Sequence, residues 1–173
     1  MKHELRKKYL NIRKTINDRN SKDKIIFDKV INNKYIIECD LVLIYVSYNN
    51  EVDTINLINY FLDKNKRVAV PKIDNDIINF YYINSINDLK KGYFGILEPV
   101  SKNIVNNYSN SVSITPGICF DKLGYRLGYG KGFYDKFFSE HDIYKIGLCY
   151  KECLVDEIEI DKYDVAVNEV ISD

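Results

Sequence analysis

Several features are missing from this sequence, and each absence excludes a class of protein. No apolar run approaches the roughly 20 residues of a membrane-spanning helix, because the longest, Leu41–Val46, has only the length of a strand. Lys plus Arg and Asp plus Glu number 25 each, so no excess charge favours nucleic acid or an anionic membrane as the main partner. The basic segment Met1–Lys8 is not followed by the apolar stretch of a signal peptide. We therefore expect a cytoplasmic protein.

Cysteine is scarce, and its spacing matches no metal or redox motif. Cys39, Cys119, Cys149 and Cys153 include no CxxC pair, and only two histidines accompany them. A metal or redox site would need a recognisable pattern of ligands. Four reduced and mostly buried thiols are the simpler interpretation, because free cysteine behaves as a small apolar residue.

The remaining composition is that of one globular domain. The chain has 173 residues, of which 46% are hydrophobic and 29% are charged, and both fractions are ordinary for a globular protein. A chain of this length buries roughly 70% of its unfolded surface, which is enough for a core. No repeat or long linker divides the sequence, so we expect a single domain over residues 1–173.

Hydrophobic spacing predicts strands that alternate with helices. Apolar residues at i, i+4, i+7 and i+11 from Leu5 indicate a helix over residues 2–18, whose cations, Arg13 included, we expect on a solvated face. Such alternation is typical of βαβ units, so we expect a three-layer α/β domain with a mainly parallel sheet and ligands at the carboxyl ends of its strands. The other predicted elements are a helix capped by Ser21, strands at 41–46 and 67–71 (the second ended by Pro71), a helix capped by Asp53 or Thr54, strands at 77–83, 112–115, 144–150 and 165–171, a helical turn at 86–91, a loop at 121–132 and a helix from about 132 to 139.

Most of the glycine is concentrated in one segment. Five of the eight glycines lie between Pro116 and Asp135, and three of them alternate at positions 128, 130 and 132. Glycine lets backbone amides approach an anion closely, and the segment runs into an expected helix start, where free N–H groups favour phosphate. Arg126 and Lys131 add positive charge, and Asp135 is a candidate Mg²⁺ ligand beside a polyphosphate. The segment matches neither a Walker A loop nor the GxGxxG spacing, and an ordinary glycine-rich turn with a helix-capping aspartate is the alternative.

This segment resembles the signature of a known family. It reads Pro116-Gly-Ile-Cys-Phe-Asp121 and then Gly124-Tyr-Arg-Leu-Gly-Tyr-Gly-Lys-Gly-Phe-Tyr-Asp135. These stretches are similar to the PGxAFD and GxRLGxGxGYYD patterns of the 5-formyltetrahydrofolate cyclo-ligases, also called 5,10-methenyltetrahydrofolate synthetases. Further similar segments span nearly the whole chain: Lys2-His-Glu-Leu-Arg6, Glu51-Val-Asp-Thr54, Val68-Ala-Val-Pro71, Gly95-Ile-Leu-Glu-Pro99, Ile146-Gly-Leu148 and the tail around Asp164.

The sequence departs from the family pattern at three places. Cys119 stands where the family has alanine, and Phe133 replaces the first tyrosine of YYD. The segment Glu159–Asp164 keeps the aspartate of the family's P-x-x-x-H-D but lacks its proline and histidine. Phe133 can still stack on a ring without the tyrosine hydroxyl.

The resemblance implies an activity, a fold and a set of site residues. The family uses ATP and Mg²⁺ to cyclise 5-formyltetrahydrofolate to 5,10-methenyltetrahydrofolate, with release of ADP and phosphate, and its fold is similar to the NagB/RpiA/CoA transferase-like group. The protein is expected to be a monomer. By resemblance, ATP would contact Lys2, His3, Glu4, Leu5, Arg6, Arg126, Leu127, Gly128, Tyr129, Gly130, Lys131, Gly132, Phe133 and Tyr134; the folate would contact Val46, Glu51, Tyr129, Gly130, Lys131, Gly132 and Phe133; Asp135 and Asp164 would hold Mg²⁺; and Arg126 and Lys131 would act in catalysis by neutralising the transferred phosphoryl group.

Other interpretations stay open from the sequence. An enzyme of the same fold could act on a different small molecule, and a non-catalytic module could bind folate or nucleotide without turnover. A nucleic-acid binder would rest only on the basic N-terminal helix. At the level of residues, Val46 could be plain core, Glu51 a solvated loop acid, and Asp164 a turn acid.

Overall fold

A six-stranded sheet forms the centre of the molecule. The computed structural model describes residues 1–173, except for the side chain of Tyr93. The strands lie in the order β11-β9-β6-β1-β2-β3, in which the first five are parallel and β3 runs antiparallel to β2. The predicted mainly parallel α/β sheet is therefore confirmed. Its strands are β1 (Leu41–Ile44), β2 (Arg67–Asp74), β3 (Ile77–Ile83), β6 (Ser111–Thr115), β9 (Tyr144–Leu148) and β11 (Glu169–Ile171).

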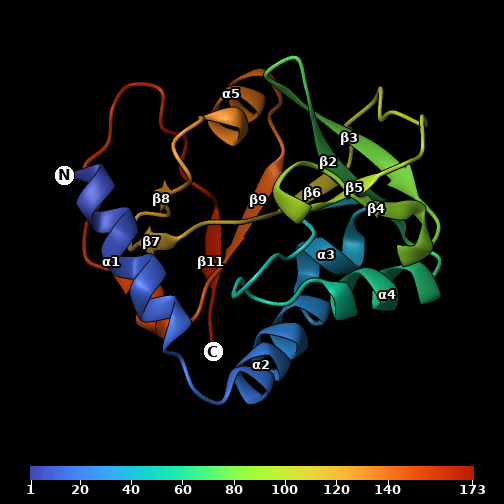
Figure 1. Ribbon diagram of the computed structural model, residues 1–173. Coiled ribbons are helices and arrows are strands. Elements are labelled where there is room, and N and C mark those ends of the chain that lie inside the picture. The colour runs from blue at the N-terminus through green and yellow to red at the C-terminus, as the bar shows by residue number, and fades with distance from the viewer.

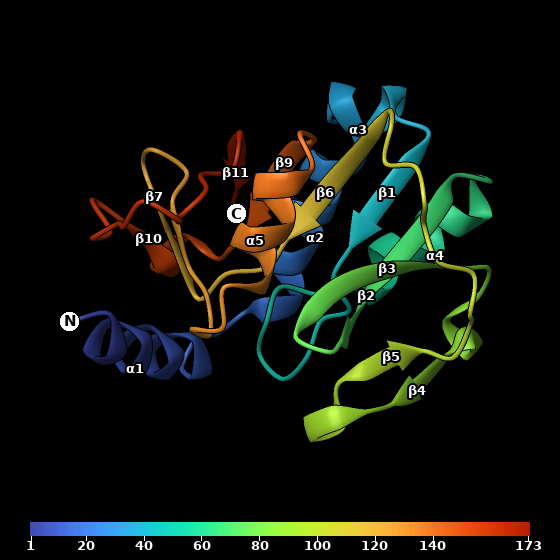
Figure 2. The same cartoon turned by 90° about the horizontal axis from the view of Figure 1, so that it is seen from above.

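Helices cover both faces of this sheet (Figure 2). Because successive side chains of a strand point to opposite faces, Val42 and Ile44 join one core cluster and Leu41 and Leu43 join another. The first cluster packs against α2 (Arg19–Ile31), α3 (Lys34–Glu38) and α4 (Ile55–Asp63), and the second packs against α5 (Phe133–Glu140). The result is the three-layer arrangement that the sequence predicted.

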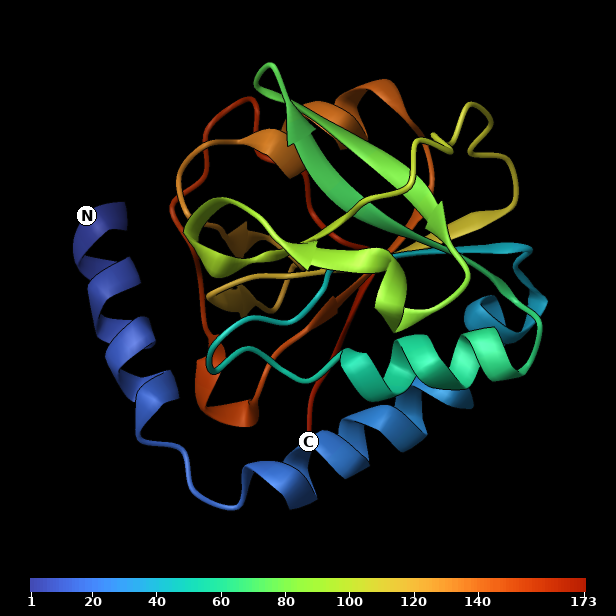
Figure 3. The ribbon, with the colours of Figure 1, turned by 45° about the vertical axis from the view of Figure 1, so that its right-hand side comes forward.

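Helix α1 (Lys2–Lys14) lies beside these layers rather than within them (Figures 1 and 3). Its apolar residues Leu5 and Tyr9 pack against a third cluster, which contains Phe120. The strands of that region, β7 (Cys119–Asp121), β8 (Arg126–Leu127) and β10 (Leu154–Val155), form a small sheet of their own.

The remaining short elements are η1 (Ile86–Asp88), β4 (Leu89–Lys91), η2 (Tyr93–Gly95), β5 (Leu97–Pro99) and η3 (Lys151–Cys153).

The prediction that Pro71 ends its strand was wrong. Strand β2 continues to Asp74, and Pro71 pairs with Phe80 of β3. On the opposite side of β2, pairing with β1 stops at the Leu43–Ala69 pair. The missing N–H of the proline therefore falls where no parallel neighbour needs it, which is one of the places where a sheet tolerates proline.

Several predicted boundaries also differ from the structure. The first helix ends at Lys14 instead of residue 18, and Ser21 lies inside α2, whose N-cap is Asp18. Of the two predicted caps of α4, Thr54 occupies the N-cap position without a capping hydrogen bond from its side chain, and the carboxylate of Asp53, one residue earlier, accepts hydrogen bonds from the amides of Ile55 and Asn56. The expected strand at 165–171 shrinks to β11, the helical turn at 86–91 is η1 followed by β4, and the expected loop at 121–132 contains the end of β7 and all of β8.

The outer edge of β3 is covered by a later segment of the chain. Tyr82 donates its amide to the carbonyl of Asn103, and Val105 donates its amide to the carbonyl of Phe80. An isolated bridge also joins Tyr81 to Ile104. The backbone groups that β3 would expose at this edge are thus partly paired.

The thiols lie inside the protein. Cys39, Cys119, Cys149 and Cys153 are all free and buried, which confirms the predicted state of the cysteines. Across the described residues, we find no helix whose length and apolar character would let it cross a membrane.

We predict that Gly147→Ala destabilises the fold. A Cβ atom at position 147 would lie 2.3 Å from Cε1 of Phe120, whose ring is fully buried. Overpacking of this kind lowers the free energy of unfolding by about 1–3 kcal/mol, which urea denaturation measures. Phe120→Leu makes room, so the double variant is expected to lose less than the sum of the single losses. Simple additivity would contradict this explanation.

Candidate active site

The glycine-rich loop of residues 128–132 connects β8 to α5 and lies against α1. Gly130 and Gly132 have φ angles of 100° and 69°, in the region that residues with a Cβ rarely adopt. Arg6 of α1 donates from Nε to the carbonyl oxygen of Gly128 over 2.8 Å. The two segments that the sequence assigned to the nucleotide, α1 and this loop, are therefore in direct contact.

The side chain of Arg126, at the start of this loop, is buried, and its hydrogen bonding is incomplete. Its Nη2 lies 3.5 Å from a carboxylate oxygen of Asp135, and the guanidinium lies over the ring of Tyr134. Burial lowers the pKa of Arg126, and the charge of Asp135 opposes that effect. Nε of Arg126 and the hydroxyl of Tyr134 are buried with no hydrogen-bond partner among the described residues. An unpaired buried polar group costs about 1–3 kcal/mol, so this region suits a polar ligand.

The two predicted metal ligands come from distant parts of the sequence and lie close together. Asp135 accepts a hydrogen bond at Oδ1 from the amide of Val165, which directly follows Asp164. Asp164 itself accepts from Lys2 Nζ over 2.8 Å and from the amide of Asp161. Mg²⁺ commonly takes one or two carboxylates together with substrate phosphates, so this pair fits it. Within the described part of the chain, no cluster of three His, Cys, Asp or Glu side chains could hold a metal by itself.

Glu51, the predicted folate ligand, is half-buried and fixed at both carboxylate oxygens. Oε2 accepts from the amide of Tyr48 over 2.8 Å, and Oε1 accepts from the hydroxyl of Tyr129 over 3.1 Å. Burial raises the pKa of Glu51, whereas the amide of Tyr48, the charge of Arg13 and the hydroxyl of Tyr129 oppose that rise. The Glu51–Tyr129 contact brings the predicted folate residue and the glycine-rich loop together.

Arg13 belongs to this site, although its position off the apolar stripe of α1 predicted a solvated face. That expectation was wrong, because Arg13 is only 4% exposed. Its Nε donates to Asn50 Oδ1 over 2.7 Å, and its Nη2 donates to the hydroxyl of Tyr129 over 3.0 Å. A signal was available in the spacing: Lys2, Arg6 and Arg13 stand at i, i+4 and i+11, which is one face of a helix.

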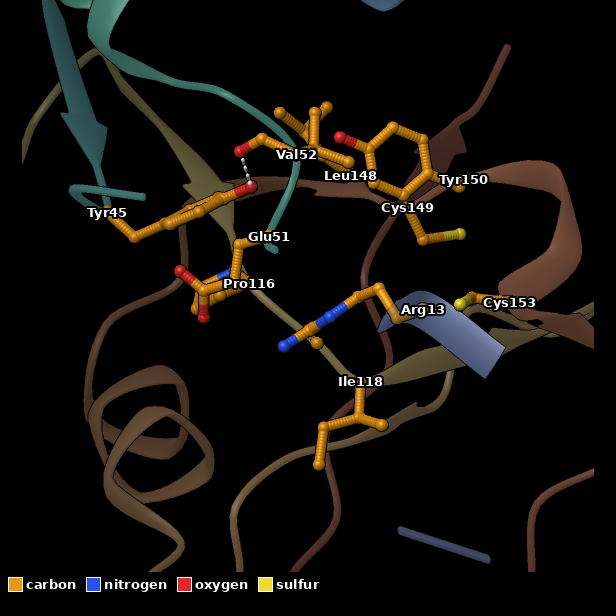
Figure 4. Close-up of a pocket in the computed structure, with 11 residues that line it drawn as sticks. Arg13, Tyr45, Glu51, Val52, Pro116, Ile118, Leu148, Cys149, Tyr150 and Cys153 are labelled. Atoms are coloured by element: carbon orange, nitrogen blue, oxygen red, sulfur yellow. Dashed lines mark hydrogen bonds between the residues drawn. The ribbon is translucent and has the colours of Figure 1, made fainter. Parts of the chain in front are cut away.

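Arg13 and Glu51 also line a narrow cavity at the carboxyl ends of β1, β6 and β9 (Figure 4). Its volume is about 10 Å³, which is room for about one water molecule. In Figure 4 the side chain of Arg13 extends from α1 toward Pro116, and the hydroxyl of Tyr45 donates to the carbonyl of Val52. The cavity is much smaller than a folate or a nucleotide.

The remaining predicted site residues differ in their surroundings. Val46 is 6% exposed and belongs to the core cluster beneath α2–α4. Phe133 is half-buried and packs against the core cluster that contains Phe137 and Phe138 of α5. Leu5 packs against the cluster that contains Phe120. The side chains of His3, Glu4 and Lys131 are exposed.

Comparison with known proteins decides the family. The model described as "5-formyltetrahydrofolate cyclo-ligase family" matches residues 1–173. The chain belongs to the 5-formyltetrahydrofolate cyclo-ligase family. The resemblance that the glycine-rich segment suggested is therefore confirmed over the whole chain.

Relatives in this family come from animals and bacteria. A probable 5-formyltetrahydrofolate cyclo-ligase of Caenorhabditis elegans is 30% identical over 162 residues, which cover 84% of this chain and 79% of that protein. The 5-formyltetrahydrofolate cyclo-ligase of Escherichia coli K12 is 27% identical over 145 residues, which cover 79% of this chain and 80% of the relative.

Solved structures of two family members have the same fold. The 5,10-methenyltetrahydrofolate synthetase of Aquifex aeolicus superposes with a TM-score of 0.87 at 30% identity, covering 98% of this chain and 88% of that one. The enzyme of the same name from Mycoplasma pneumoniae gives a TM-score of 0.78 at 25% identity, covering 99% and 98%. The architecture around the candidate site is thus that of methenyltetrahydrofolate synthetases.

We predict a pH-dependent contribution of the Lys2–Asp164 pair to stability. Burial alone would raise the pKa of Asp164, but the hydrogen bonds from Lys2 and from the amide of Asp161, together with the charges of Lys2 and Arg126, outweigh burial and hold the pKa below the usual 3.8. A lowered carboxylate pKa stabilises the fold above pH 3.8, and this stability is lost as the pH falls through the folded value. Asp164→Asn should therefore reduce the free energy of unfolding at pH 7 by up to about 1 kcal/mol, as expected for a partly exposed pair. The loss, measured by denaturation, should shrink below pH 3.8; a loss that persists there would contradict this assignment.

Proposed function

We propose that this protein catalyses the cyclisation of 5-formyltetrahydrofolate to 5,10-methenyltetrahydrofolate, driven by conversion of ATP to ADP and phosphate. The observation that carries the proposal is the hydrogen bond between Tyr129 and Glu51. It joins the glycine-rich loop, suited to a triphosphate, to the carboxylate suited to the ring N–H donors of a pterin. Membership of the cyclo-ligase family supports the same reaction.

The chemistry needs an activated formyl oxygen. The N5-formyl group is an amide, so its carbon is a weak electrophile and its oxygen a poor leaving group. Transfer of the γ-phosphoryl group of ATP to that oxygen gives an imidate phosphate, and ADP leaves. Nitrogen N10 then attacks the formyl carbon, loses its proton, and phosphate departs with the former formyl oxygen. Holding N10 beside that carbon removes much of the entropy cost of ring closure.

Positive charge beside the transferred group is the main requirement of phosphoryl transfer. In our proposal Arg126 and Lys131 supply it, with Lys2 and Arg6 on the nucleotide side. The unpaired Nε of Arg126 and the unpaired hydroxyl of Tyr134 support this role, since a phosphate oxygen could accept from both. The exposure of Lys131 leaves its ammonium available to a ligand.

Asp135 and Asp164 are the residues that would hold Mg²⁺. The ion would neutralise the negative charge of the phosphates. The ammonium of Lys2 lies 2.8 Å from a carboxylate oxygen of Asp164, so this carboxylate lies in a place that favours positive charge. Membership of this family supports ATP as co-substrate, because a ligase couples bond formation to the cleavage of a nucleoside triphosphate.

The proposal also includes a cytoplasmic monomer. Four free, buried thiols agree with a reducing compartment. Helix α1, the loop of residues 47–51 after β1 (the 47–51 loop), the glycine-rich loop and the segment around Asp164 contact one another through hydrogen bonds within the chain, so the proposed site needs no residue from a second copy. Size-exclusion chromatography with light scattering would test the monomer.

An absorbance assay tests the reaction directly. Purified protein is mixed with 5-formyltetrahydrofolate, ATP and Mg²⁺, and the near-ultraviolet band of the methenyl product is followed. We expect product only when ATP and Mg²⁺ are both present. Folded protein that binds ATP but forms no product would overturn the proposal and favour a different small-molecule substrate. Folate binding without turnover would indicate a binding module.

Lys131→Gln is predicted to reduce kcat/KM by about 100-fold or more, the usual loss when a preorganised stabilising group is removed. Lys136→Gln is the matched control, because Lys136 is also exposed, carries the same charge and lies one turn into α5. We expect the control to keep wild-type kinetics. Equal losses in both variants would mean that general positive charge, rather than Lys131, is what the reaction needs.

A further inference from the structure

Arg13 is a buried cation at the opposite end of α1 from Lys2. Among the described residues, no carboxylate lies within ion-pair distance of its guanidinium, which instead donates to Asn50 and Tyr129. A buried charge is costly unless its hydrogen bonds are satisfied. The planar fork of arginine can hold two acceptors in fixed directions, which an ammonium does not do. The side chain of Arg13 therefore fixes the positions of its two acceptors relative to each other.

The geometry that Arg13 fixes is that of Glu51. Asn50 directly precedes Glu51, and the hydroxyl of Tyr129 accepts from Arg13 while donating to Oε1 of Glu51. The guanidinium thus joins the 47–51 loop to the glycine-rich loop through one planar group. Figure 4 shows the guanidinium of Arg13 approaching the region where Glu51 and Pro116 lie.

A second arginine locks this junction from α2. Arg19 donates from Nη1 to the carbonyl of Arg13 over 3.1 Å and from Nη2 to the carbonyl of Glu51 over 3.4 Å. Its guanidinium also lies over the ring of Tyr150. The backbones that carry Arg13 and Glu51 are therefore tied together as well as their side chains.

Helix α1 contacts two consecutive residues of the glycine-rich loop. Arg6 binds the carbonyl of Gly128 and Arg13 binds the hydroxyl of Tyr129. A shift of α1 would move the nucleotide side and the folate side of the site together.

Building on the proposed function, we propose that Arg13 is a positioning residue that orients Glu51 and Tyr129 for the folate and links them, through α1, to the nucleotide side. It does not need to touch either substrate. Removing it should weaken folate use first, because its contacts lead to Glu51, and ATP use to a smaller extent through α1.

Kinetics of Arg13→Gln and Arg13→Lys test this role. Arg13→Gln should raise the KM for 5-formyltetrahydrofolate at least tenfold and the KM for ATP by no more than about threefold. Arg13→Lys keeps the charge but cannot hold both acceptors, so an intermediate KM is expected. Lys14→Gln is the control, because Lys14 is the next residue on α1 and is exposed; it should leave both KM values unchanged. If Arg13→Gln does not fold, Arg13→Lys carries the test.

The pH profile separates positioning from a structural role. Loss of the Arg13 charge should move the acidic limb of kcat/KM for the folate to higher pH, because that charge favours ionised Glu51. Arg13→Lys should restore the wild-type limb. Burial raises the pKa values of Tyr45, Tyr129 and Tyr134 above the usual 10.0, so these three tyrosines are neutral in this range and do not contribute to the limb. The titratable or charged groups that act on the Glu51 carboxylate are Arg13 of α1, Tyr45 after β1, Tyr129 of the glycine-rich loop and Tyr134 of α5, whereas Arg19 of α2 binds the backbone carbonyl of Glu51.

The outcomes distinguish this inference from the proposed function. Wild-type protein that forms no methenyl product overturns both. An active wild type with a folate KM and acidic limb that Arg13→Gln leaves unchanged overturns the role of Arg13 alone. Equal changes in both KM values without a shifted limb would reduce Arg13 to a structural residue.

Discussion

The site depends on the contact between α1 and the glycine-rich loop. The loop has almost no β-pairing of its own after β8, and two of its glycines adopt left-handed backbone angles. Glycine in such a segment loses more conformational entropy on ordering than any other residue. The hydrogen bonds from Arg6 and Arg13 supply an external support for this shape. The helix therefore serves the loop as a scaffold, which explains why it lies outside the layered core.

Charged side chains at the candidate site lie in pairs of opposite sign. Lys2 lies on Asp164, Arg126 lies beside Asp135, and Arg13 reaches Glu51 through a tyrosine hydroxyl. Each cation is thus held near an acid, but the guanidinium of Arg126 keeps an unpaired N–H. The charges of these pairs largely cancel, while the unpaired N–H of Arg126 is a donor that suits a phosphate. Fixed donors of this kind need little reorganisation when charge develops during a reaction.

The sequence predicted the parallel sheet, the position of α5 and the grouping of glycine with Arg126 and Asp135, because periodicity and motif spacing are local signals. It failed where tertiary pairing overrides a local rule. Pro71 lies inside β2 because its neighbour strand has already ended there, and no local pattern contains that information. Arg13 was misassigned because its burial depends on Asn50 and Tyr129, residues far away in the chain. The hydrogen bond from the amide of Val165 to Asp135 also joins residues far apart in the chain, so no local sequence pattern predicts it.

The covered edge of β3 has a consequence for the behaviour of the protein in concentrated solution. An open strand edge invites pairing with another chain, and such pairing leads to aggregation. Here the carbonyl of Phe80 and the amide of Tyr82 are already bonded to the segment at 103–105, and the opposite edge strand, β11, has only three residues. Both edges of the central sheet are therefore poor templates for strand addition. We expect little self-association through this sheet.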